Sequence, residues 1–148
     1  MRALEWQDCK SVSDEAIRAV EARLGVRFPS DYVECVRRCD GGWPKPHHFD
    51  YPDPALGPVE TSIGRFLSLD STRKGNLLDV VEWLSDQLPA QVVPFADEPG
   101  GDFLCFDYRG GGAPAVVYWM HEREGEEAVA PLAPTFAAFL DQLRERAA

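Results

Sequence analysis

The sequence predicts an α+β fold, with a central, mainly antiparallel sheet on which an N-terminal helical hairpin and a C-terminal helix pack. Two short apolar runs, residues 92–96 and 103–108, flank a turn of Asp, Glu, Pro and Gly, which is typical of a β-hairpin. A third apolar run, residues 115–121, follows a glycine-rich break and can extend the same sheet. Apolar residues at helical spacing occur before and after these runs.

Two helices joined by a short connection are expected in the first 40 residues. Ser13 can cap the first helix, and Gly25 can end it. Ser30 can cap the second helix, which we expect to end at residues 40–42. Because only a few residues join the two helices, a helical hairpin is predicted.

Residues 43–62 are predicted to form a loop. The segment contains five prolines, which disfavour a long regular element, and it is longer than an ordinary connection. It also carries aromatic side chains, among them Trp43 and Tyr51. These rings can be anchors for a partner, or they can pin the loop to the core.

The remaining elements follow from short patterns. Residues 66–69 are a predicted strand, and residues 128–133 are a further short run. A helix is expected to begin at Asn76 or Asp79 and to reach Leu88. Pro134 and Thr135 precede the final helix, whose apolar face is formed by Phe136, Phe139, Leu140 and Leu143.

The length of 148 residues fits a single domain over residues 1–148 that buries a core of its own. No apolar run approaches the roughly 20 residues that span a bilayer. The first ten residues lack the apolar core of a secretory signal. We therefore expect a cytoplasmic protein without membrane contact.

Four cysteines are predicted to be free thiols, because disulfides are rare in the cytoplasm. Cys35 and Cys39 lie one helical turn apart, and His47 and His48 follow them, so a zinc site is conceivable. The spacing lacks the two close ligand pairs of a zinc knuckle. We expect no metal and no cofactor.

The net charge of −10 is concentrated in the second half of the chain. Residues 1–74 carry 12 acidic and 11 basic residues, whereas residues 75–148 carry 13 acidic and 4 basic residues. Phosphate binding needs cationic side chains, so direct contact with nucleic acid is not expected. A basic protein would be attracted to the acidic half.

The order of several short motifs resembles the SUKH superfamily. In the first half the matching residues are Glu21, Leu24, Gly25, Phe28, Pro29, Asp31, Tyr32, Gly41, Gly42 and Trp43, with Asp40 where Asn is commoner. In the second half they are Val93, Pro94, Phe95, Ala96, Asp97, Gly100, Gly101, Asp102, Phe106, Asp107, Val117, Tyr118, Trp119, His121, Glu122, Leu132, Ala133, Thr135, Phe136, Phe139 and Leu140.

The resemblance implies a SUKH-like fold and a non-enzymatic binding protein. Bacterial members of the superfamily are immunity proteins that bind and neutralise a toxin domain. Many such toxins are nucleases with basic surfaces. Other members, including the fungal Smi/Knr proteins, are intracellular regulators or scaffolds, and this second function needs no toxin.

We expect the partner, a cognate toxin domain such as a basic nuclease, to contact an acidic rim with an aromatic anchor, Trp43 or Tyr51. The rim consists of Asp97, Glu98, Asp102, Glu122, Glu124, Glu126 and Glu127. Two catalytic alternatives remain: a divalent-ion-dependent hydrolase at the turn of residues 97–102, and a general base at His121 beside Glu122. Each of these residues also has an ordinary role at a turn or strand end.

Overall fold

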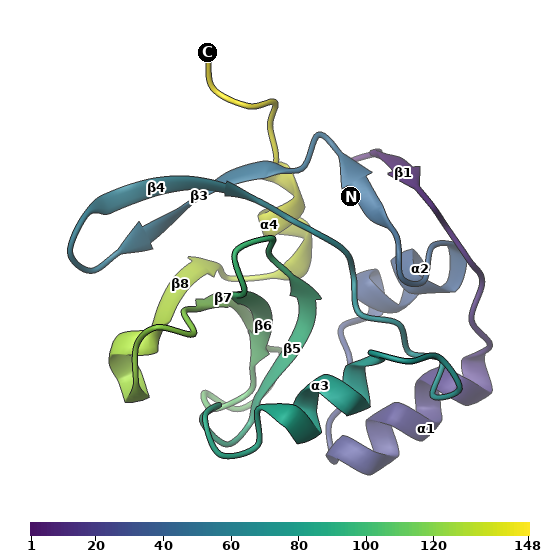
Figure 1. Cartoon of the computed structure of the whole chain (residues 1–148). Coiled ribbons are helices and arrows are strands. Elements are labelled where there is room, and N and C mark those ends of the chain that lie inside the picture. The colour runs from purple at the N-terminus through teal and green to yellow at the C-terminus, as the bar shows by residue number, and fades with distance from the viewer.

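The centre of the fold is a four-stranded antiparallel sheet in the order β5-β6-β7-β8. The computed structural model describes residues 1–148 and confirms the α+β fold (Figure 1). The first half of the chain contains β1 (Glu5–Gln7), α1 (Asp14–Leu24), α2 (Ser30–Arg38), β2 (Trp43–Lys45), β3 (His48–Asp53) and β4 (Gly57–Ser62). The second half contains α3 (Leu77–Trp83), β5 (Val92–Asp97), β6 (Phe103–Asp107), β7 (Ala115–Trp119), the 3-10 turn η1 (Gly125–Ala128), β8 (Val129–Ala133) and α4 (Phe136–Asp141).

The two N-terminal helices form as their caps predict. The Ser13 hydroxyl accepts a hydrogen bond from Ala16 N (3.1 Å), and Gly25, at φ 68°, ends α1 by donating to the Glu21 carbonyl. The second cap differs from the prediction, because Pro29 occupies the N-cap position and Ser30 is already helical. The Asp31 carboxylate of α2 accepts a hydrogen bond from Ala137 N at the start of α4 (3.1 Å), which joins α2 to α4.

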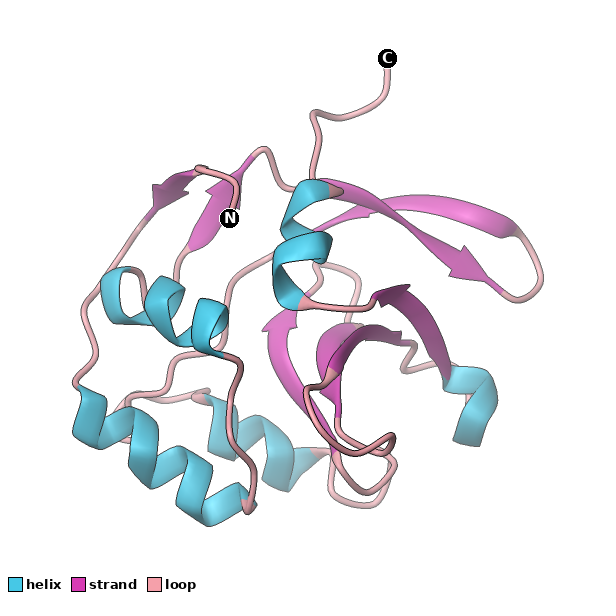
Figure 2. Ribbon diagram, turned by 180° about the vertical axis from the view of Figure 1, so that it is seen from behind, coloured by secondary structure: helices cyan, strands magenta, loops and turns pink.

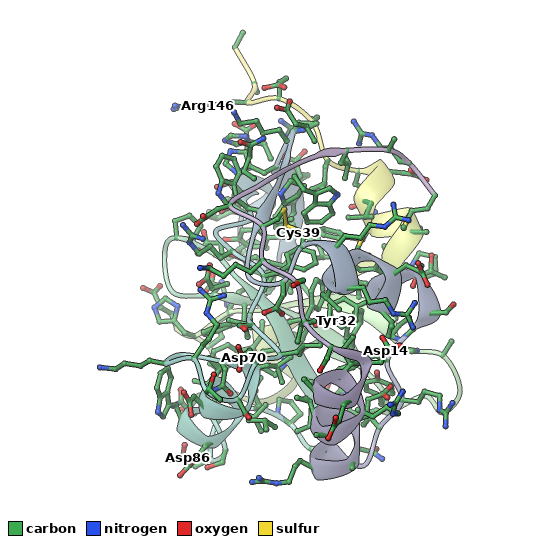
Figure 3. The ribbon with its side chains drawn as sticks, turned by 90° about the vertical axis from the view of Figure 1, so that its right-hand side faces the viewer. Asp14, Tyr32, Cys39, Asp70, Asp86 and Arg146 are labelled. Carbon is green, nitrogen blue, oxygen red and sulfur yellow. A yellow bond between two sulfur atoms is a disulfide. The ribbon has the colours of Figure 1, made fainter.

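Buried aromatic rings join the helices to the sheet. Tyr32 of α2 is fully buried, and its ring lies 5.0 Å from Phe106, 5.9 Å from Phe95 and 5.6 Å from Phe136. Phe95 and Phe106 stack across β5 and β6 at 4.3 Å. Figure 3 shows Tyr32 in the interior, between the N-terminal helices and the strands.

The prediction of a loop over residues 43–62 is wrong, because this segment forms β2, β3 and β4. Strand β2 pairs with β1, and β3 pairs with β4 in a hairpin that projects beyond the sheet (Figures 1 and 2). A two-stranded hairpin leaves both outer edges unpaired, so a proline facing outward costs no ladder hydrogen bond. Pro52 and Pro58 stand opposite each other in this hairpin.

Two other predicted elements are shorter than expected. Phe66 forms a single bridge with Ala96 at the β5 edge, in place of a strand over residues 66–69. Helix α3 begins after Asn76, whose side chain accepts from Asp79 N, but it ends at Trp83 rather than Leu88. No helix of the structure combines the length and apolar character needed to cross a membrane.

The segment after α2 is fixed to the N-terminal strand. A disulfide joins Cys9 to Cys39, which corrects the prediction of free thiols for these two residues, while Cys35 and Cys105 are free. A Cβ on Gly42 would lie 2.3 Å from the Gln7 carbonyl oxygen, so only glycine permits this close approach. Because its sulfur is bonded to Cys9, Cys39 is not a free ligand for a zinc site with Cys35, His47 and His48.

Asp40, where the family motif usually has Asn, is a structural residue. Its side chain is buried, with 1% of the residue exposed, and accepts from the Ser68 hydroxyl (2.5 Å) and Leu69 N (2.8 Å). Burial raises the pKa of this carboxyl. The two bonds use different carboxylate oxygens, so Asn would accept only the bond from Leu69 N and would donate its amide to the Ser68 hydroxyl.

The disulfide predicts a redox-dependent stability. It closes a separation of 30 residues, so Cys9→Ser should lower the free energy of unfolding by about 3 kcal/mol, because the unfolded chain gains freedom. Urea denaturation with and without reductant measures the effect. The reduced wild-type protein should match the variant, and a wild-type curve that does not change with reductant would contradict the prediction.

Candidate partner-binding surface

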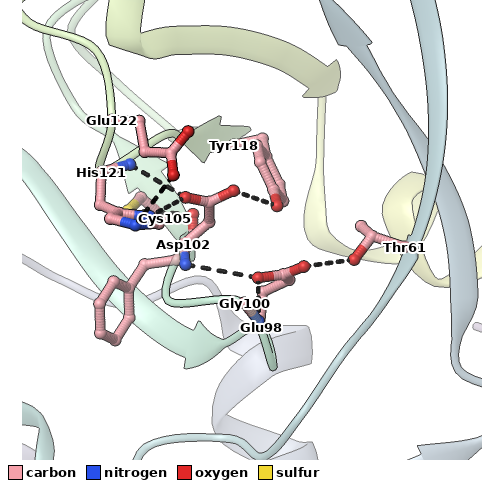
Figure 4. Close-up of polar contacts among 9 residues, drawn as sticks. Thr61, Glu98, Gly100, Asp102, Cys105, Tyr118, His121 and Glu122 are labelled. Carbon is pink, nitrogen blue, oxygen red and sulfur yellow. Dashed lines mark hydrogen bonds and ion pairs between the residues drawn. The ribbon is translucent and has the colours of Figure 1, made fainter.

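The turn between β5 and β6 is held by Glu98. Its carboxylate accepts from Gly100 N (2.6 Å) within the turn and from the Thr61 hydroxyl of β4 (2.5 Å). Figure 4 shows these contacts at the junction between the hairpin and the sheet. Glu98 therefore holds the turn and connects it to the β3–β4 hairpin.

Asp102 joins the same turn to the end of β7. Its carboxylate accepts from the Tyr118 hydroxyl (2.6 Å) and from His121 N (2.9 Å), and it lies 2.6 Å from His121 Nδ1 (Figure 4). The side chain is 14% exposed. Burial and the neighbouring Asp102 charge both raise the pKa of Tyr118, so its hydroxyl stays a donor. Gly101, at φ 106°, has no Cβ that would crowd the His121 ring.

The predicted rim does not form one continuous surface. Asp97 lies at the β5 edge, where its carboxylate accepts from Arg65 N (2.8 Å), and burial raises its pKa. Glu98 and Asp102 are occupied by the hydrogen bonds just described. Three of the seven rim carboxylates, those of Asp97, Glu98 and Asp102, therefore hold the turn and the β5 edge.

The other four rim residues are exposed on the connection between β7 and β8. They are Glu122, Glu124, Glu126 and Glu127, and the side chains of Glu122 and Glu126 are 86% and 79% exposed. We call this segment, residues 121–127, the acidic connection. A backbone hydrogen bond from Met120 N to the Ala128 carbonyl (2.8 Å) closes its base.

Two arginines fix the acidic connection. Arg109 contacts Glu126 and also pairs with Asp107 at the end of β6 (3.0 Å). Arg123 pairs with Asp53 (3.2 Å), at the end of β3. The acidic connection is thus held to the sheet on one side and to the hairpin on the other.

The two candidate aromatic anchors lie apart. Tyr51, on β3, stacks on Tyr118 with ring centroids 4.0 Å apart. Tyr118 donates to Asp102, which also binds His121 at the start of the acidic connection. Trp43 lies on β2, beside His47 (5.2 Å) and under the Lys45 ammonium (5.5 Å). The β1–β2 ribbon is on the far side of the molecule from the turn that follows β7 (Figure 1).

Sequence reasoning missed Leu56 at the hairpin tip. This side chain is 76% exposed, and the Asp53 carboxylate holds the tip by accepting from Ala55 N (2.8 Å) and Leu56 N (3.0 Å). These backbone donors, together with Arg123, hold the pKa of Asp53 below its usual range. The sequence signal was the Asp–Pro–x–x–Gly pattern of a tight turn. It was not recognised as a hairpin turn because the whole segment was expected to be a loop.

The structure adds no further catalytic group to either of the two catalytic alternatives. Asp102 positions His121 as a carboxylate positions a catalytic histidine, but the neighbour at Nε2 is the Glu122 carboxylate at 3.9 Å, which is not a nucleophile. At the turn, Asp97 and Asp102 bind different segments. The structure contains no group of three or more His, Cys, Asp or Glu side chains placed to hold a metal ion.

The contacts predict effects of different size for Asp102 and Glu122. Asp102→Asn replaces one accepting oxygen by a donor and should lower the free energy of unfolding by about 2 kcal/mol. Glu122→Gln, at an exposed site, should change it by less than about 0.5 kcal/mol. Urea unfolding measures both, and equal effects would show that Asp102 does not hold the turn.

Comparisons with known proteins agree with this architecture. A model of the SMI1 / KNR4 family (SUKH-1) matches residues 11–142. The chain is also similar to the SPbeta prophage-derived uncharacterized protein YokK of Bacillus subtilis (strain 168), with 23% identity over 124 residues. That match covers 74% of this chain and 62% of YokK, so the chain spans less than two thirds of the relative's length. Because the family match extends over most of its residues, the chain belongs to the SMI1/KNR4 family (SUKH-1).

Proposed function

We propose that this chain is a non-enzymatic immunity protein that acts in the cytoplasm and neutralises a cognate bacterial toxin domain by direct binding. The observation that carries the proposal is the acidic connection, where exposed carboxylates are presented on a segment fixed by Arg109 and Arg123. A fixed surface loses little conformational freedom on binding, which favours affinity.

The charge of this surface indicates the chemistry of the partner. A nuclease toxin holds phosphates with basic side chains, and an acidic protein can cover that surface and attract it over a distance. The chain's net charge of −10 adds to this attraction. The partner proposed is therefore a basic toxin domain.

An exposed apolar side chain lies near the acidic connection. Leu56 is exposed at the tip of the hairpin, and Asp53, at the base of the tip, pairs with Arg123 of the acidic connection. Tyr51 lies further along the same strand. We place Leu56 and Tyr51 on the partner-facing side and leave Trp43, on the distant β1–β2 ribbon, outside it.

A cytoplasmic location determines the redox state of the Cys9–Cys39 pair. Thiols are kept reduced there, so the Cys9–Cys39 pair would be open. The N-terminal segment would then be held by β1–β2 pairing and by the hydrogen bond from Asp40 N to the Lys10 carbonyl (2.7 Å). Neither contact belongs to the acidic connection, so the proposed surface does not need the disulfide.

The regulatory or scaffold role known for Smi/Knr proteins is the alternative, and family membership favours it equally. A pull-down with the tagged protein at low and high salt distinguishes the two. Recovery of a single basic toxin domain, lost at high salt, supports immunity through the acidic connection. Recovery of several signalling or cell-wall proteins and no toxin supports the scaffold role.

Charge reversal on the acidic connection should slow association with the toxin domain. We expect the combined change Glu122→Lys, Glu124→Lys and Glu127→Lys to reduce the association rate by about tenfold or more at low salt, because it removes electrostatic steering. Glu126 is retained so that its contact with Arg109 is kept. Surface plasmon resonance at several salt concentrations measures the rate.

The matched control carries the same change in net charge elsewhere. Glu15→Lys, Glu82→Lys and Asp86→Lys are exposed positions on or next to α1 and α3, and none of them forms an ion pair. This control should retain most of the association rate. Equal slowing by both triple variants would show that only net charge matters and would remove the acidic connection from the proposal.

A further inference from the structure

A cavity of about 440 Å³ lies at the β5 edge of the sheet, on the opposite edge from β8. It is formed by four parts of the chain: the residues after β1, the turn after α2, the segment from residue 65 to residue 75, and Asp97 at the end of β5. Its charged lining residues are Asp8, Lys10, Arg65, Arg73, Lys74 and Asp97. In a protein of net charge −10, this cavity has more cations than carboxylates.

The carboxylates in and beside the cavity already have partners. Asp8 pairs with the Arg65 guanidinium (2.5 Å), and Asp97 accepts from Arg65 N (2.8 Å). Just outside the lining, Asp70 accepts from the backbone N–H and the hydroxyl of Thr72, at 2.9 and 2.7 Å. These acids and Arg65 therefore satisfy one another or the backbone.

The other three cations have no such partner. The side chains of Lys10, Arg73 and Lys74 form none of the ion pairs and none of the side-chain hydrogen bonds within the chain. Two of the chain's three lysines lie in this lining. Asp8, Asp40 and Asp70 partly balance the Arg73 charge, which favours their charged forms. The guanidinium donors of Arg73 bind none of these carboxylates and are available to an anion.

The backbone that carries these cations is fixed. The carbonyl of Lys10 accepts from Asp40 N (2.7 Å), and the carbonyl of Arg73 accepts from the Asn76 side chain (2.7 Å). The Arg73 guanidinium lies against the chain at Gly41, where a Cβ would be 3.2 Å from Nη1. The Arg73 side chain thus lies beside the turn that Asp40 stabilises.

We propose that this cavity binds a compact diphosphate group. Guanidinium and ammonium groups bind phosphate oxygens strongly, and the three side chains that make no ion pair or hydrogen bond within the chain can donate to a diphosphate. Only two of the eleven lining residues, Phe66 and Leu67, are apolar, which favours a small polar ligand over a large apolar one. The volume lies within the range of small-molecule sites. The diphosphate can be free or part of a nucleotide.

Calorimetric titration at constant ionic strength tests the proposal with three probes: sodium pyrophosphate, ADP and citrate. Pyrophosphate or ADP should bind more tightly than citrate, whose charge is carried by carboxylates. Tighter binding of ADP identifies a nucleotide as the source, and equal binding identifies the diphosphate group alone. The absence of binding by both phosphates, or citrate binding as tight as pyrophosphate, overturns the proposal.

Charge-neutral variants locate the site. Arg73→Gln and Lys74→Gln should each weaken binding by about tenfold, the effect of one charge-assisted hydrogen bond. Lys74 is exposed, so its variant keeps the test valid even if Arg73→Gln alters the fold. The matched control is Arg146→Gln, which removes the same charge near the C-terminus, far from Asp70 (Figure 3). Weakening by Arg146→Gln to the same degree would show general charge attraction instead of a site.

Discussion

The packing of Tyr32 against the sheet is the contact on which the rest of the structure depends. Its ring touches Phe95 of β5, Phe106 of β6 and Phe136 of α4, so one side chain of α2 fixes a helix, two strands and a second helix together. Each such aromatic pair contributes about 1 kcal/mol beyond the burial of area. Because α2 is fixed, the turn that follows it is fixed too, and Asp40 can anchor the residue 68–69 segment. The cavity at the β5 edge depends on that turn.

The sequence predicted the elements whose signals are local. Ser13 and Gly25 bound α1 through hydrogen bonds to residues within one turn, and the strands that flank the 97–102 turn pair as the expected hairpin. The loop prediction for residues 43–62 failed because the effect of a proline on a strand depends on where that strand lies in its sheet. A proline disrupts a central strand, whereas the outer edge of a two-stranded hairpin accepts it. Whether a strand is central or at an edge is a property of the tertiary structure.

The candidate surface shows the same division. Glu98 and Asp102 resemble the glutamates of the acidic connection in sequence, and only their partners separate them. Those partners, Thr61 and Tyr118, lie 37 and 16 residues away. No local pattern encodes such pairings, so the sequence could place seven carboxylates near one another but could not distinguish those that hold the turn from those that are exposed on the acidic connection. The disulfide between Cys9 and Cys39 escaped prediction for the same reason, since its geometry depends on β1 lying beside the end of α2.

The charges of the molecule are separated by its sheet. Strands β5 and β8 form the two edges, and the cation-lined cavity lies at the first edge while the acidic connection leads into the second. Water and salt weaken the interaction of exposed charges beyond about 10 Å. The charges nearest to a ligand therefore act on it most strongly, although the net charge is −10. A basic partner at the acidic connection and an anion in the cavity therefore do not compete for the same residues. A protein that binds a basic domain through one edge keeps the other edge available for a second, oppositely charged ligand.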